Sequence, residues 1–221
     1  MLPGVTSALP RNDATTRDAR RAWTIGGALL IVSTLVGTIA APMLWTIPGS
    51  GFAGPALFSI ALLIFAFGIR RAGSVTARRP LGTGALAVLA LWTFASRFVW
   101  DFIPDESLAL DQQVVLGTVG TLMAAILAAV AAVQVARAGV VPSPWNWAPF
   151  WALIAVIVPS LLQLLIFAVG SSSSSQAAVT VLVGLDQLVR STAVVFLGVL
   201  AIVLATRPAS TRTVSIIAPR R

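Results

Sequence analysis

The chain of 221 residues is 57% hydrophobic and 10% charged, and its mean hydropathy of +0.94 lies far above that of soluble domains. Its net charge of +8 arises from fifteen arginines and seven acidic residues, because lysine is absent. Histidine, cysteine and tyrosine are absent too. These absences exclude histidine-ligated haem, the usual zinc sites, Ser-His catalysis, thiol-disulfide chemistry and lysine Schiff bases.

Six apolar stretches follow one another along the chain, and each is long enough to cross a bilayer, which takes roughly 17–25 residues. They are predicted at residues 23–47, 52–69, 81–103, 108–136, 145–169 and 177–205. The first is longer than a signal-peptide core, so we interpret it as a retained span. The sequence therefore predicts an all-α polytopic membrane protein, a six-transmembrane-helix bundle over residues 23–206. A disordered N-terminal segment at 1–22 and a basic tail at 207–221 would flank the bundle.

Thirteen of the fifteen arginines lie outside these stretches, on alternate connections along the chain. They precede the first stretch, join the second to the third and the fourth to the fifth, and follow the sixth, at positions 11, 17, 20, 21, 70, 71, 78, 79, 137, 207, 212, 220 and 221. The connections around Gly49, Asp105 and Ser173 contain none. Because cytoplasmic connections are enriched in basic residues, both termini are predicted to be cytoplasmic, and the protein is expected in the cell membrane.

Two Arg-Asp pairs lie inside the apolar stretches. Arg97 and Asp101 are in the third stretch, and Asp186 and Arg190 are in the sixth. A spacing of four residues places the members of each pair on one helix face, close enough for an ion pair. The third and sixth stretches run in opposite directions, so both aspartates are expected on the outer side. An inverted repeat of the first three spans on the last three would give this arrangement.

Two interpretations of these pairs remain open. In the first, each pair neutralises its own charges, or the two helices cross-pair and fix the bundle. In the second, the pairs line a polar cavity that binds an ion or an anionic ligand, because ionisable residues are costly inside a membrane. Pro159 would kink the fifth stretch beside this cavity. The candidate ligand-binding residues are Arg97, Asp101, Gln163, Asp186, Gln187 and Arg190.

An acidic group surrounds the predicted outer ends of the third and fourth stretches: Asp101, Asp105, Glu106 and Asp111. Its spacing matches no calcium loop, so a solvated turn is predicted, and neither a metal nor a cofactor is expected. The Pro104-Asp105-Glu106 turn is similar, over three residues, to the Pro-x-Glu motif of the small multi-span carotenoid cyclases. The second half of the chain has no counterpart of this motif, and we assign no family from it.

Small residues recur every four positions along the fourth stretch, at Gly120, Ala124, Ala128, Ala132 and Ala136. They form one continuous face that another helix can approach closely. We interpret this face first as packing within the bundle and second as an interface with another subunit.

The scarcity of reactive side chains and of extramembrane segments favours a protein without catalysis, acting as an accessory, assembly or sensing subunit. Its expected partners are the lipid bilayer and a membrane-protein partner or a second copy, and no nucleic acid is expected. One alternative is a carrier or channel built on the two Arg-Asp pairs. The other is an isoprenoid- or lipid-modifying membrane enzyme with Asp186 or the Pro104–Glu106 turn as its acid.

Overall fold

The computed structural model of the protein describes residues 12–40, 43, 47, 49–69, 72–102, 109–169 and 176–207, and within these ranges every regular element is a helix. The elements are α1 (Asn12–Leu35), the π-helical η1 (Val36–Ala40), the 3-10 helix η2 (Ser50–Phe52), α3 (Ala53–Phe67), α4 (Pro80–Phe102), α5 (Leu110–Ala138), the 3-10 helix η4 (Trp145–Trp147), α6 (Ala148–Val169) and α7 (Gln176–Thr206). Six helical segments are long and apolar enough to cross a membrane. For the described residues, the prediction of an all-α fold with six helices able to span a membrane is therefore confirmed.

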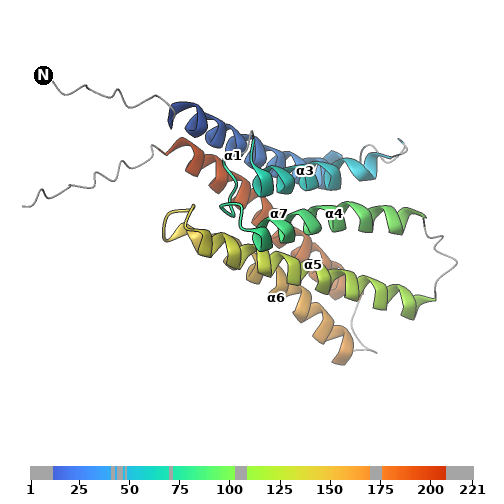
Figure 1. The fold of residues 1–221 in the computed structure, drawn as a ribbon. Coiled ribbons are helices and arrows are strands. Elements are labelled where there is room, and N and C mark those ends of the chain that lie inside the picture. The colour runs from blue at the N-terminus through green and yellow to red at the C-terminus, as the bar shows by residue number, and fades with distance from the viewer. Residues whose placement is uncertain are drawn as a thin grey trace, which may run out of the picture.

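The six long helices form a ring in chain order. Each packs against its neighbours in the sequence α1, α3, α4, α5, α6 and α7, and the ring closes where α7 packs along α1. The contact between α5 and α6 is the sparsest in the ring, and Figure 1 shows α6 running obliquely to α5. The start of α1, the end of α7 and the α3–α4 and α5–α6 connections lie at one end of the bundle (Figure 1). We call it the arginine-rich end, because it carries Arg20, Arg78, Arg79 and Arg137.

The first helix begins earlier in the chain than the predicted first span. Residues 12–22, which we expected to be disordered, are helical, and residues 1–11 lie outside the described part of the chain. Alanine and arginine, which favour helices, make up six of these eleven residues, so the helix extends beyond the apolar stretch that hydropathy detects. The helical segment is described as far as Ala40, and residues 41–42, 44–46 and 48 lie outside the described part of the chain.

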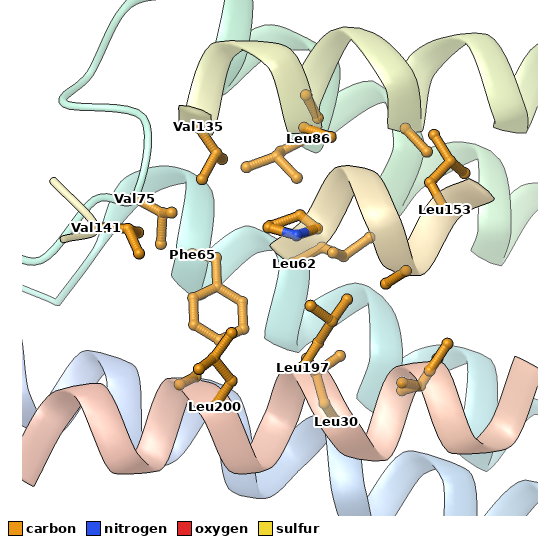
Figure 2. A pocket seen from close by; sticks show the side chains of 18 of the residues that line it. Leu30, Leu62, Phe65, Val75, Leu86, Val135, Val141, Leu153, Leu197 and Leu200 are labelled. Carbon is orange, nitrogen blue, oxygen red and sulfur yellow. The ribbon is translucent and has the colours of Figure 1, made fainter. Parts of the chain in front are cut away.

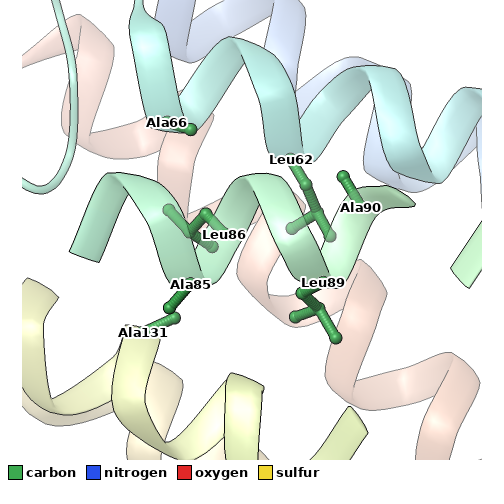
Figure 3. Close-up of a cluster of buried hydrophobic side chains, with 7 residues drawn as sticks. All are labelled: Leu62, Ala66, Ala85, Leu86, Leu89, Ala90 and Ala131. Atoms are coloured by element: carbon green, nitrogen blue, oxygen red, sulfur yellow. The ribbon is translucent and has the colours of Figure 1, made fainter. Parts of the chain in front are cut away.

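The interior of the bundle is built mainly from small residues. Of the eighteen buried apolar residues in the described ranges, twelve are alanine, so the helices can approach closely. The largest cluster joins α3, α4 and α5 through Leu62, Ala66, Ala85, Leu86, Leu89, Ala90 and Ala131 (Figure 3). Large side chains such as Leu91, Ile126 and Leu165 are exposed instead. This distribution of large apolar side chains is that of a surface facing lipid.

The small-residue face of α5 packs inside the bundle. This agrees with the first of the two interpretations of this face, packing within the bundle. Ala124 and Ala128 pack against the α3–α4–α5 cluster, and Ala132 and Ala136 are buried. The carbonyl oxygen of Gly120 accepts a hydrogen bond of 3.2 Å from the indole N–H of Trp92 on α4. This bond gives the indole N–H of Trp92 a partner within the bundle, although tryptophan usually lies near the ends of a span.

Candidate functional site

The ring of helices surrounds an apolar cavity of about 270 Å³. Figure 2 shows side chains from different helices converging on this space, with Leu86 and Val135 opposite Leu197 and Leu200. All six long helices contribute to its lining, through residues that include Leu30, Leu62, Phe65, Leu86, Val135, Leu153, Leu197 and Leu200. Because these side chains carry no polar atoms, the cavity suits an apolar molecule better than water.

The arginine-rich end of the cavity is lined by the two connections at that end. Val75 of the α3–α4 connection and Val141 of the α5–α6 connection lie there (Figure 2). Trp145 of η4, which follows the same α5–α6 connection, also lines the cavity. We call these three residues the floor of the cavity. The backbone N–H of Val75 donates to the carbonyl oxygen of Phe65 at 3.0 Å.

Two side-chain hydrogen bonds fix the α3–α4 connection beneath the cavity. The buried hydroxyl of Ser74 donates to the carbonyl oxygen of Ala66 at 2.7 Å. The indole N–H of Trp23 on α1 donates to the carbonyl oxygen of Gly73 at 2.8 Å. The α3–α4 part of the floor is therefore attached to both α1 and α3.

A polar cluster of Ser160, Gln163, Asp186 and Arg190 joins α6 to α7. Within α7, Arg190 Nε donates to Asp186 Oδ2 at 2.7 Å. Between the helices, Arg190 Nη2 donates to Ser160 Oγ at 3.0 Å. The Ser160 hydroxyl has one hydrogen, which it can donate to Asp186 Oδ1 at 2.9 Å or to the carbonyl oxygen of Val156 at 3.2 Å. Donation to Asp186 closes a triangle of three side chains across the α6–α7 contact.

Gln163 forms a second link between the same two helices. Its Nε2 donates to the carbonyl oxygen of Leu182 at 2.7 Å. Leu182 precedes Asp186 by one helical turn, so this bond lies beside the triangle on the α6–α7 contact. Gln187, also predicted from the sequence, is exposed on α7.

The polar cluster and the cavity lie on the same faces of α6 and α7. Val156 lines the cavity on α6, and Ser160 follows it by four residues. Val194 lines the cavity on α7, and Arg190 precedes it by four residues. Since α6 and α7 run in opposite directions, both spacings place the cluster one helical turn, or ~5.4 Å, beyond the cavity on the side away from its floor.

The polar cluster has no net formal charge, but some of its hydrogen-bond donors have no partner among the described residues. The formal charges of Asp186 and Arg190 cancel, and their side chains are 16% and 43% exposed, respectively. The guanidinium of Arg190 gives one N–H to Asp186 and one to Ser160. A guanidinium has five N–H groups, so three have no partner among the described residues. In a membrane such donors need an acceptor from water, lipid or a ligand.

The other predicted pair lies elsewhere in the ring. Arg97 is exposed on α4, with its guanidinium against Gly51 of η2. Helix α4 packs between α3 and α5, whereas α7 packs between α1 and α6, so the two pairs lie on opposite sides of the ring. The side chain of Asp101 lies outside the described residues, as do residues 103–108 and the side chain of Asp111, which complete the acidic group.

Ser160 and the cavity are the parts of the site that sequence reasoning missed. Ser160 stands three residues before Gln163, on the same helix face, and this spacing could have identified it. The cavity had no such signal, because its lining residues are the same types that face lipid. The chain matches no protein-family model, and comparison with curated proteins and with solved structures gives no significant match either.

Proposed function

We propose that this protein is a multi-span protein of the cell membrane that binds an apolar, lipid-like molecule in its central cavity and acts without catalysis, as a sensing or accessory subunit. The observation that carries the proposal is the cavity of about 270 Å³ with an apolar lining from all six long helices. An engineered apolar cavity of about 150 Å³ stays dry and binds benzene. An apolar cavity of about 270 Å³ has room for a short hydrocarbon chain.

The polar cluster supports a binding role over a catalytic one. Both carboxylate oxygens of Asp186 accept hydrogen bonds, one from Arg190 and the other from Ser160. A general acid must carry a proton and direct it at the substrate, so this arrangement does not favour Asp186 as an acid. Ser160 has no histidine to activate it, because the chain contains none.

The proposed orientation places the arginine-rich end in the cytoplasm, with both termini. Arg20, Arg78, Arg79 and Arg137 gather at this end, and the positive-inside rule assigns such an end to the cytoplasm. The floor of the cavity then lies toward the cytoplasm and the polar cluster farther toward the outside.

A carrier is the second candidate, and the depth of the cluster favours it. Arg190 is ten residues from Thr180, where the apolar span of α7 begins, which corresponds to ~15 Å along the helix. This is about half of a hydrocarbon core of roughly 30 Å. Flux of the bound molecule through the wild-type protein in reconstituted vesicles separates a carrier from a binding subunit.

Photo-crosslinking with an alkyl diazirine tests the proposal in nanodiscs. We expect adducts at Leu197, which lines the cavity, besides those at lipid-facing residues such as Val199. Ala152→Leu and Ala193→Leu fill part of the cavity, so each should reduce labelling of Leu197 several-fold. Labelling of Val199 should stay unchanged in both variants.

Ala155→Leu is the matched control for this experiment. Ala155 lies on α6 three residues after Ala152 but is exposed, so the added carbons face lipid. Labelling of Leu197 should remain at the wild-type level in this control. Equal labelling of Leu197 in the wild type, the control and both cavity variants would contradict the proposal. Native mass spectrometry of protein extracted gently from its own membrane then identifies the bound molecule or a protein partner.

A further inference from the structure

We propose that the cavity and the polar cluster form one amphipathic binding site, which takes a short-chain apolar molecule ending in a neutral oxygen acceptor such as a hydroxyl, ether or carbonyl group. The chain occupies the cavity, and the oxygen accepts a hydrogen bond from Arg190. This inference rests on the proposed function and deepens it, because it names the chemical class of the ligand.

The continuity of the two parts sets the ligand's orientation. Val156 and Ser160 share one face of α6, and Arg190 and Val194 share one face of α7, with one turn between the members of each pair. The opposite end of the cavity is the floor at Val75, Val141 and Trp145, whose side chains are hydrocarbon apart from one indole N–H. A molecule with one polar end therefore places its chain toward the floor and its oxygen at the cluster.

The unused donors of Arg190 select an acceptor. Its guanidinium is oriented by Asp186 and Ser160, while 43% of the side chain remains exposed. Three of its N–H groups have no partner among the described residues, and arginine has no acceptor of its own. A ligand oxygen one helical turn from the cavity satisfies such a donor, whereas an alkane leaves it unsatisfied.

The charge balance of the cluster selects a neutral group over an ion. The carboxylate of Asp186 already neutralises Arg190 at 2.7 Å. A carboxylate or phosphate on the ligand would add net negative charge about halfway through the membrane, which is costly. A neutral acceptor adds none and still receives a hydrogen bond from a charged donor, which is stronger than one from a neutral donor.

Competition against the alkyl diazirine at Leu197 tests the ligand class on the wild-type protein in nanodiscs. The competitors are decane, decanol, decyl methyl ether and decanoic acid, with concentrations corrected for partition into protein-free nanodiscs. We expect decanol and the ether to displace the probe at about tenfold lower concentration than decane, because one charge-assisted hydrogen bond strengthens binding by about this factor. The ether can accept but not donate, so its agreement with decanol identifies the required group as an acceptor. Ionised decanoic acid should compete no better than decane.

The Asp186→Asn/Arg190→Met variant removes the guanidinium without leaving an uncompensated charge. Decanol and the ether should lose their tenfold advantage in it, while decane competes as in the wild type. Binding of decane also shows that the variant is folded. If the variant does not fold, the wild-type series alone decides between the alkane and the three head groups.

The remaining outcomes separate the two proposals. Equal competition by all four molecules in the wild type would overturn the head-group assignment and leave the apolar cavity standing. Strongest competition by decanoic acid would overturn it in favour of an anion site. Failure of all four molecules to displace the probe would overturn the proposed function and this inference together.

Discussion

Among the described residues of α6 and α7, Asp186 and Arg190 are the charged residues within the membrane-spanning segments. Each is expensive there alone, and the 2.7 Å ion pair offsets much of that cost. Ser160 adds a hydrogen bond to each partner from the neighbouring helix. The three side chains therefore act as a unit, and changes to them are not additive.

We expect Asp186→Asn alone to destabilise the protein more than Asp186→Asn combined with Arg190→Met. The single change leaves a positive charge at membrane depth, whereas the double change removes both charges. The loss for the single variant should fall below the roughly 3–5 kcal/mol typical of a broken buried pair, because 43% of the Arg190 side chain is exposed. Thermal unfolding in nanodiscs measures both variants, and a double variant less stable than the single one would contradict this account.

The polar cluster was only partly predictable from the sequence, because its contacts differ in range. The Asp186–Arg190 bond joins residues one turn apart on one helix, so spacing alone predicted it. The bond between Ser160 and Asp186 joins residues 26 apart, and it depends on the packing of α6 against α7. Arg97 illustrates the converse, since its position across the ring follows from packing that spacing does not encode.

At the scale of the elements, a contact between two glycines brings the first span close to the last. A Cβ added at Gly27 of α1 would lie 2.5 Å from the carbonyl oxygen of Gly198, and one at Gly198 of α7 would lie 2.7 Å from that of Gly27. Both distances are shorter than van der Waals contact, so only glycine allows the two backbones to meet here. The contact closes the ring of helices and holds one side of the cavity.

We expect Gly198→Ala to lower the melting temperature by several degrees, because the added methyl group must push α1 away from α7. Gly184→Ala is the matched control on the same helix. A Cβ at Gly184 meets no described atom within 4 Å, and alanine favours a helix over glycine by about 1 kcal/mol, so this variant should be as stable as the wild type or more so. Thermal unfolding of the two variants side by side is the measurement. Equal behaviour would show that the close contact between α1 and α7 is unimportant.

Hydropathy predicted the number of spans and most of their limits, because a membrane imposes a length and a composition on each helix. It placed the last span at 177–205, and α7 runs from Gln176 to Thr206. It missed the start of α1, since residues 12–22 are helical but polar. It also gave no indication of the cavity, because Leu197 inside the ring and Leu188 on its exposed surface are the same residue type. Distinguishing such positions requires the packing of all six helices.

At the scale of the whole molecule, the arginines distinguish the two ends of the axis around which the ring of helices is built. The start of α1, the end of α7 and the α3–α4 and α5–α6 connections lie at one end of the bundle (Figure 1), and the sequence places Arg20, Arg78, Arg79 and Arg137 in or beside these segments. The three helices α1, α3 and α4 form one consecutive arc of the ring, and α5, α6 and α7 form the other. Two arcs of equal helix number are also what an inverted repeat requires, and that repeat stays a hypothesis.

The orientation of this axis in the membrane can be measured by cysteine labelling. No native cysteine has to be removed first, because the chain contains none. We expect Ser173→Cys, in the arginine-free connection before α7, to react with a membrane-impermeant maleimide in intact cells. Thr211→Cys, in the basic tail, should react only after permeabilisation, since the positive-inside rule holds basic segments in the cytoplasm. Labelling of both variants after permeabilisation controls for accessibility of the thiols. The opposite pattern would invert the protein in the membrane and place the floor of the cavity, instead of the polar cluster, toward the outside.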